Sequence, residues 1–158
     1  MTKLKRIIFL HSVFTEKFIK TSQAVSAASN LWSFNFLKNL KYHKIKVICA
    51  GIEHNPSWPK GKFYIKASKK NYVYNFVNKK FNYINLYLFK TIYLFYAYLN
   101  YLLNFTFKKG DLVVIFNNSF IAKVLQLLNF YKKIPWVCIV ADLNYPKKAN
   151  GYVYLNWN

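Results

Sequence analysis

The chain has 158 residues, of which 54% are hydrophobic and 21% aromatic. This length suits one domain with its own core, and the composition excludes an intrinsically disordered chain. The formal net charge is +20, from 24 basic and 4 acidic residues, which restricts the possible partners but does not define a site. Arg6 is the single arginine and the lysines are scattered, however, whereas phosphate sites usually recruit arginine. We therefore expect a generally basic surface, with anionic membrane attraction as the second interpretation and nucleic acid disfavoured.

Cys49 and Cys138 both lie in apolar runs, and no Cys/His cluster has the spacing of a metal site. We expect two buried free thiols in a reducing compartment, and no bound metal. The first apolar run, at residues 7–10, is too short for the core of a secretory signal. The prediction is a cytoplasmic protein, and a peripheral position on the inner face of the membrane stays open.

Four short apolar runs predict buried β-strands, at residues 7–10, 45–50, 112–116 and 136–141. Strands that are apolar throughout, rather than at alternate positions, are typical of a parallel sheet with both faces covered. Two weaker candidates, at residues 63–65 and 72–74, rest on alternation and β-propensity.

A first helix is predicted at residues 23–41, with Ser22 as its N-cap. Its inward face, at spacings of three and four, is Val25, Ala28, Trp32, Phe36 and Leu40. Small residues crowd its first turns, which fits either close packing on the sheet or a ligand near the helix end.

The segment at residues 86–107 is long enough to cross a membrane. One stripe of it is mostly polar (Lys90, Tyr93, Ala97, Asn100, Asn104), and another is mostly apolar (Leu88, Ile92, Phe95, Leu99, Leu102, Thr106). A packed helix, a membrane-surface helix and a spanning helix all stay open, and amphipathicity favours the first. Aromatic residues from Tyr93 to Tyr101 suit shallow insertion.

A third helix is predicted at residues 119–131, capped by Asn118 or Ser119, with four inward residues: Ile121, Val124, Leu125 and Leu128. Alternating strands and helices predict an α/β, Rossmann-like three-layer domain with a mostly parallel sheet. We expect this domain at residues 1–146. Residues 147–158 are expected to be a truncated tail or the start of a missing second domain.

Ligands of open α/β sheets bind beyond the carboxyl ends of the strands, where the strand order reverses. The candidate cleft residues are His11 and Ser12, Asn117, and Asp142. Glu53 and His54 follow another strand. Purely structural roles stay open for these residues. An aspartate at a strand end can cap a helix, and a histidine there can form its hydrogen bonds with neighbouring groups of the chain. The sequence has no glycine-rich phosphate loop, no nucleophile elbow and too few carboxylates for a clear acid–base pair, so catalytic residues are unknown.

Five segments follow one another in a familiar order. The first is the strand Arg6–His11, and the second is a helix that opens with Ala27–Asn30 and ends with Asn35–Leu40. The other three are predicted strands with the residues that follow them: Ile45–Cys49, Asp111–Asn117 and Ile134–Asp142. Over residues 4–146 this order resembles the N-terminal domain of family 4-like glycosyltransferases, which have the two-Rossmann-domain GT-B architecture.

The resemblance implies sugar transfer from a nucleotide-sugar donor to a glycan or lipid-linked acceptor, with no other cofactor. In the family this domain holds the acceptor, and a C-terminal domain holds the nucleotide and a glutamate pair. This sequence lacks that domain and the family's glycine-rich loop, so we expect a truncated or split enzyme, inactive alone, completed by a missing domain or a partner chain. His11, Ser12, Asn117 and Asp142 would then bond acceptor hydroxyls or a donor phosphate, with Asp142 orienting the acceptor.

Two alternatives stay open. A non-enzymatic basic module would bind an anionic membrane surface or nucleic acid, with affinity that falls steeply as salt rises. The other alternative is a degraded remnant of an enzyme, which would have no activity.

Overall fold

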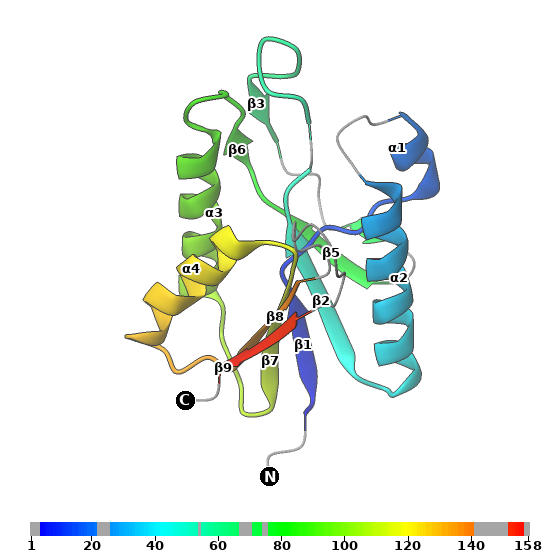
Figure 1. Ribbon diagram of the computed structural model, residues 1–158, viewed down its shortest axis with the longest axis vertical. Helices are drawn as coiled ribbons and strands as arrows, with labels where there is room; N and C mark the ends of the chain where they lie inside the picture. Colours follow the sequence, from blue (N-terminus) through cyan, green and yellow to red (C-terminus); the bar gives the residue numbers. More distant parts are fainter. Residues whose placement is uncertain are drawn as a thin grey trace.

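The computed structural model describes residues 4–21, 26–53, 55–66, 71–73, 76–140 and 152–156. Among these residues, seven strands form one sheet in the order β4-β5-β2-β1-β7-β8-β9 (Figure 1). The strands are β1 Arg6–Phe9, β2 Lys46–Gly51, β4 Asn71–Val73, β5 Phe76–Lys80, β7 Asp111–Phe116, β8 Trp136–Val140 and β9 Tyr152–Asn156. The five from β5 to β8 run parallel, and the edge strands β4 and β9 run antiparallel. A separate two-stranded ribbon pairs β3 (Tyr64–Ile65) with β6 (Tyr83–Ile84).

Helices cover both faces of the sheet. The short α1 (Glu16–Thr21) and α2 (Ala27–Tyr42) lie to the right of the sheet in Figure 1, and α3 (Lys90–Asn104) and α4 (Ser119–Asn129) lie to the left. The fold is therefore α/β with a mostly parallel sheet, as predicted, and it is compatible with a Rossmann-like domain.

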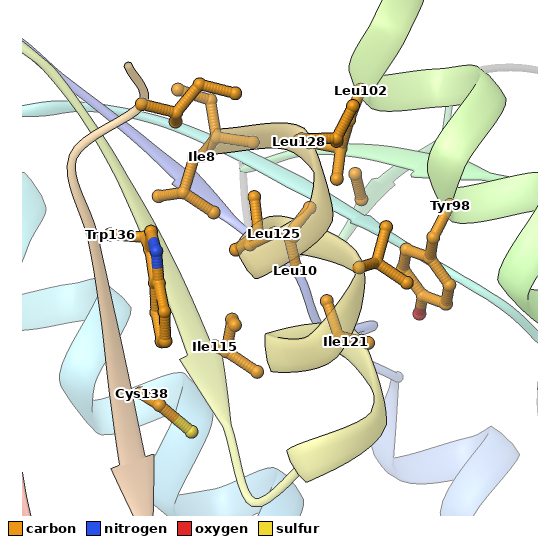
Figure 2. Close-up of a cluster of buried hydrophobic side chains, with 14 of the residues drawn as sticks. Ile8, Leu10, Tyr98, Leu102, Ile115, Ile121, Leu125, Leu128, Trp136 and Cys138 are labelled. Carbon is orange, nitrogen blue, oxygen red and sulfur yellow. The ribbon is translucent and has the colours of Figure 1, made fainter. Parts of the chain in front are cut away.

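Alternate side chains of β1 enter two separate cores. Ile7 and Phe9 pack with Leu37 of α2, whereas Ile8 packs on the other face against α3 and α4. Figure 2 shows this second core, in which side chains of β1, β7 and β8 gather against α4, with Tyr98 and Leu102 entering from α3. Burial on both faces is why β1 needs an unbroken apolar sequence.

The four apolar runs are confirmed as β1, β2, β7 and β8, within one residue at the described ends. The weaker candidates correspond to β3 and β4. Four elements were not predicted from the sequence: α1, β5, β6 and β9. Strand β9 continues the main sheet beside β8, although no element was predicted within residues 147–158. The domain boundary at residue 146 stays a prediction, because it falls outside the described residues.

Two helix predictions need correction in detail. The N-cap of α2 is Ser26, whose side chain accepts a hydrogen bond from the Ser29 N–H, and not Ser22, which lies outside the described residues. The innermost α2 residues are Asn30, Ser33 and Leu37, and Ala28 is exposed. For α4 the four predicted inward residues are all buried, and Asn118 is the cap.

The predicted apolar stripe of α3 is confirmed in part, because Leu102 is buried and Phe95 and Leu99 pack against the same core. Tyr98, which was not in the stripe, is buried as well, whereas Leu88, just before the helix, and Ile92 are 78% and 63% exposed. Aromatic packing favours the burial of Tyr98: Phe81 contacts Tyr98 edge-on at 5.1 Å between ring centres and also packs on Tyr101. Within the described part of the chain, no helix combines the length and hydropathy needed to cross a bilayer.

The single arginine fixes the amino-terminal ends of β1 and β7. Arg6 and Asp111 are register partners, and the guanidinium makes a two-pronged ion pair with the carboxylate. Asp111 also accepts the Lys108 N–H at 2.7 Å, and Arg6 lies over the Phe105 ring. Burial raises the pKa of Asp111, but the hydrogen bonds from Arg6 and Lys108 outweigh it and hold the pKa below its usual range.

We predict that Asp111→Asn lowers the free energy of unfolding at pH 7 by about 2–3 kcal/mol, because the amide turns one donor toward Arg6 or Lys108. Because the pKa of Asp111 is lowered in the folded protein, the stabilisation by its carboxylate is complete above about pH 4. It is lost progressively as the pH falls through the pKa of Asp111 in the folded state. Urea unfolding at pH 7 and pH 3 checks it: the gap between variant and wild type should shrink in acid. The control Glu16→Gln, at an exposed carboxylate, should change stability little at either pH. A pH-independent gap would contradict the assignment.

Candidate functional site

The strand order reverses at β1. The chain proceeds from β1 to β2 on one side and later returns to place β7 on the other side. Such a switch leaves a crevice beyond the carboxyl ends of the two diverging strands. A pocket of about 300 Å³ occupies this place, and residues that follow both β1 and β7 line it. The topology alone therefore accounts for the position of the pocket.

Three predicted site residues meet in this pocket. His11 and Ser12 line it from the end of β1, and Asn117 lines it from the end of β7. The fourth, Asp142, lies outside the described residues, as does His54. Glu53 is elsewhere: its carboxylate pairs with Lys80 at 3.0 Å, and it does not line the pocket.

The backbone that carries Ser12 is held by two buried asparagines. Residues 12–14 are almost fully buried although they are irregular, so their peptide groups need partners inside the protein. Asn30 of α2 accepts the Phe14 N–H at 2.9 Å and donates to the Phe14 carbonyl at 3.1 Å. Asn78 of β5 donates to the Val13 carbonyl at 3.0 Å. Together α2 and β5 fix the path of the chain into the pocket.

Gly51, at the end of β2, makes room for Ser12. A Cβ at position 51 would lie 2.4 Å from the Ser12 hydroxyl oxygen and 2.9 Å from its backbone nitrogen. Ser12 is 1% exposed, and its hydroxyl has no hydrogen-bond partner among the described residues. A buried hydroxyl without a partner is costly, which is a reason to expect that a ligand or water bonds to it.

The turn from β7 into α4 forms the opposite wall. Asn117 has a φ of 48°, a left-handed conformation that asparagine tolerates better than most residues. Its N–H bonds to the Ile139 carbonyl at 2.9 Å. Asn118 then caps α4 by accepting the Ile121 N–H at 3.1 Å. Asn118 and Phe120 both line the pocket, so the amino end of α4 borders it.

Aromatic rings fix the position of His11. The imidazole lies edge-on to Phe9 at 5.7 Å and to Phe116 at 5.8 Å between ring centres. Trp32 of α2 stacks on Phe116 at 4.1 Å and closes this cluster from the other side. The histidine is thus held between β1 and β7 by its neighbours on both strands.

Lys90 is a pocket residue that the sequence analysis did not single out. Its ammonium donates to the Asn55 carbonyl at 3.1 Å and lies 5.8 Å from the centre of the Tyr83 ring. Burial lowers the pKa of Lys90. The sequence placed Lys90 on the mostly polar stripe of α3, and the packing of that helix brings it to the pocket together with Leu94 and Tyr98. No short-range sequence signal marks it.

The pocket thus offers hydroxyl, amide and imidazole groups plus one ammonium, against apolar walls of Leu10, Ile52 and Phe116. This combination suits a ligand with several hydrogen-bonding groups. Among the described residues no three of His, Cys, Asp and Glu lie close enough together to hold a metal ion.

No family model matches the chain, and neither a curated protein nor a solved structure does.

We predict that Asn30→Ala destabilises the protein by about 2–3 kcal/mol, since it leaves the buried N–H and carbonyl of Phe14 without partners. Urea unfolding measures the loss, and hydrogen exchange should show faster exchange of the Phe14 amide. Asn35→Ala, at an exposed asparagine of the same helix, is the matched control. Equal effects of the two substitutions would argue against Asn30 as the anchor of this segment.

Proposed function

We propose that this chain is the acceptor-binding half of an enzyme that transfers a sugar from a nucleotide-sugar donor to a glycan or lipid-linked acceptor. The observation that carries the proposal is the polar pocket at the switch point between β1 and β7, which brings His11, Ser12 and Asn117 together. Sugars present several hydroxyls on an apolar ring, and the pocket offers matching polar groups between apolar walls. The segment resemblance described above points to the same half of the same class of enzyme.

Each residue has a role in this proposal. The Ser12 hydroxyl, which has no partner among the described residues, and the Asn117 side chain bond acceptor hydroxyls, and His11 borders the same space from β1. Asp142, which follows β8 in the sequence, is proposed to orient the acceptor. The nucleotide and the acidic pair belong to a second domain or a partner chain in this scheme, so the chain alone binds acceptor without turnover.

The proposal predicts binding of the labelled chain to a subset of sugars on an immobilised glycan array. Ser12→Ala should then weaken binding about fivefold, because one hydrogen bond of about 1 kcal/mol is lost. Ser33→Ala is a close control, since Ser33 is equally buried and its hydroxyl also lacks a partner among the described residues, but it lies away from the pocket. Isothermal titration of the best glycan supplies the affinities.

Free nucleotide sugars, titrated in the same way, should not bind this chain. Binding of no glycan, or equal effects of Ser12→Ala and Ser33→Ala, would count against an acceptor site in this pocket. Binding of nucleotide sugars to the isolated chain would instead argue that it is the donor half.

A further inference from the structure

One end of the molecule exposes large apolar side chains. Tyr87 and Leu88 are each 78% exposed, and Ile92 and Tyr96 on α3 are 63% and 67% exposed. We call the full set the aromatic tip: Trp58, Phe63, Tyr64, Tyr87, Leu88, Phe89, Ile92 and Tyr96. Single exposed apolar residues are ordinary, but large exposed apolar patches mark interaction surfaces.

Three observations relate parts of the tip that are separated in the sequence. Trp58 forms a bridge with Leu86, just before Tyr87, and its ring meets Phe63 edge-on at 6.4 Å. Tyr64 and Tyr96 line one groove of about 400 Å³ between the β3–β6 ribbon and α3. In Figure 1 this ribbon and the start of α3 lie at the top of the molecule.

Three lysines accompany the part of the tip that contains Trp58 and Phe63. Lys60, Lys62 and Lys66 are exposed within the same loop and ribbon as Trp58 and Phe63. The described acidic residues leave this charge uncompensated: Glu53 is paired with Lys80, Asp111 is paired with Arg6, and Glu16 lies on α1. Exposed aromatics beside uncompensated lysines match the two layers of an anionic bilayer surface, which are the acyl boundary and the charged headgroups.

We propose that the aromatic tip docks the protein on an anionic lipid bilayer by shallow insertion. Trp58, Phe63, Leu88 and Ile92 enter the headgroup–acyl boundary, and Lys60, Lys62 and Lys66 pair with lipid phosphates. The inserting residues differ from those expected from the sequence, because Tyr98 is buried and Tyr101 is half-buried beneath Phe81. The docking holds whether or not the pocket binds a sugar.

Co-sedimentation with phosphatidylcholine vesicles, with and without phosphatidylglycerol, tests the proposal. Wild type should bind the anionic vesicles far better, and Leu88→Ser/Ile92→Ser should weaken that binding about tenfold or more. The matched control is Tyr42→Ser/Tyr131→Ser, at residues 83% and 88% exposed but outside the tip, which should bind as wild type does. Circular dichroism confirms that each variant is folded.

Charge is tested separately. Lys60→Gln/Lys62→Gln should weaken binding to the anionic vesicles about fivefold for each lysine removed. This loss should be larger than the loss caused by Lys38→Gln/Lys123→Gln, at exposed lysines on α2 and α4. The fluorescence of Trp58 should shift to the blue on anionic vesicles, and Trp58→Phe should abolish that shift.

Three results would overturn the docking tip. One is no binding to anionic vesicles. Another is equal weakening by the tip and control variants, which would mean adhesion through the general positive charge. The third is self-association in sedimentation velocity that Leu88→Ser/Ile92→Ser abolishes while vesicle binding stays unchanged, which would assign the tip to a second copy of the chain.

Discussion

The buried exit of the chain from β1 is the constraint on which the site depends. A segment at 12–14 that is neither helix nor strand is nearly inaccessible to water, so its peptide groups must bond within the protein. The Asn30 amide satisfies both groups of Phe14, and Asn78 satisfies the Val13 carbonyl. These bonds tie α2 and β5 to the point where β1 ends, which explains why two asparagines are tolerated in the interior.

The same constraint shapes the pocket. With residues 12–14 held inward, Ser12 lies against the end of β2, where only glycine leaves it space. On the other side of the reversal in strand order, Asn117 takes a left-handed turn that ends β7 and lets Asn118 start α4. Two different local features, the Gly51 contact beside Ser12 and the asparagine turn after β7, thus border the crevice beyond the carboxyl ends of β1 and β7. The polar groups of the pocket follow from that opening.

The sequence predicted the central strands well because each is buried on both faces, which leaves an unbroken apolar run. It also predicted His11, Ser12 and Asn117 as cleft residues, since a strand end fixes which residues come next. It missed β5, because this strand carries Asn78, Lys79 and Lys80, whose burial depends on partners elsewhere in the chain such as Val13 and Glu53. Lys90 was missed for a related reason: its place depends on tertiary contacts of α3, which no local pattern encodes.

The rotation of α3 therefore decides more than packing. Turning Tyr98 and Leu102 into the core places Lys90 and Leu94 at the pocket, and it turns Ile92 and Tyr96 outward. The apolar stripe expected from sequence shares Leu102 with the observed core but would also have buried Ile92, which would remove one anchor of the aromatic tip. The aromatic contacts of Phe81 with Tyr98 and Tyr101 favour the observed rotation. One helix thus forms a wall of the pocket on one face and part of the exposed aromatic surface on another, so a ligand in the pocket and a bilayer at the tip would both contact α3.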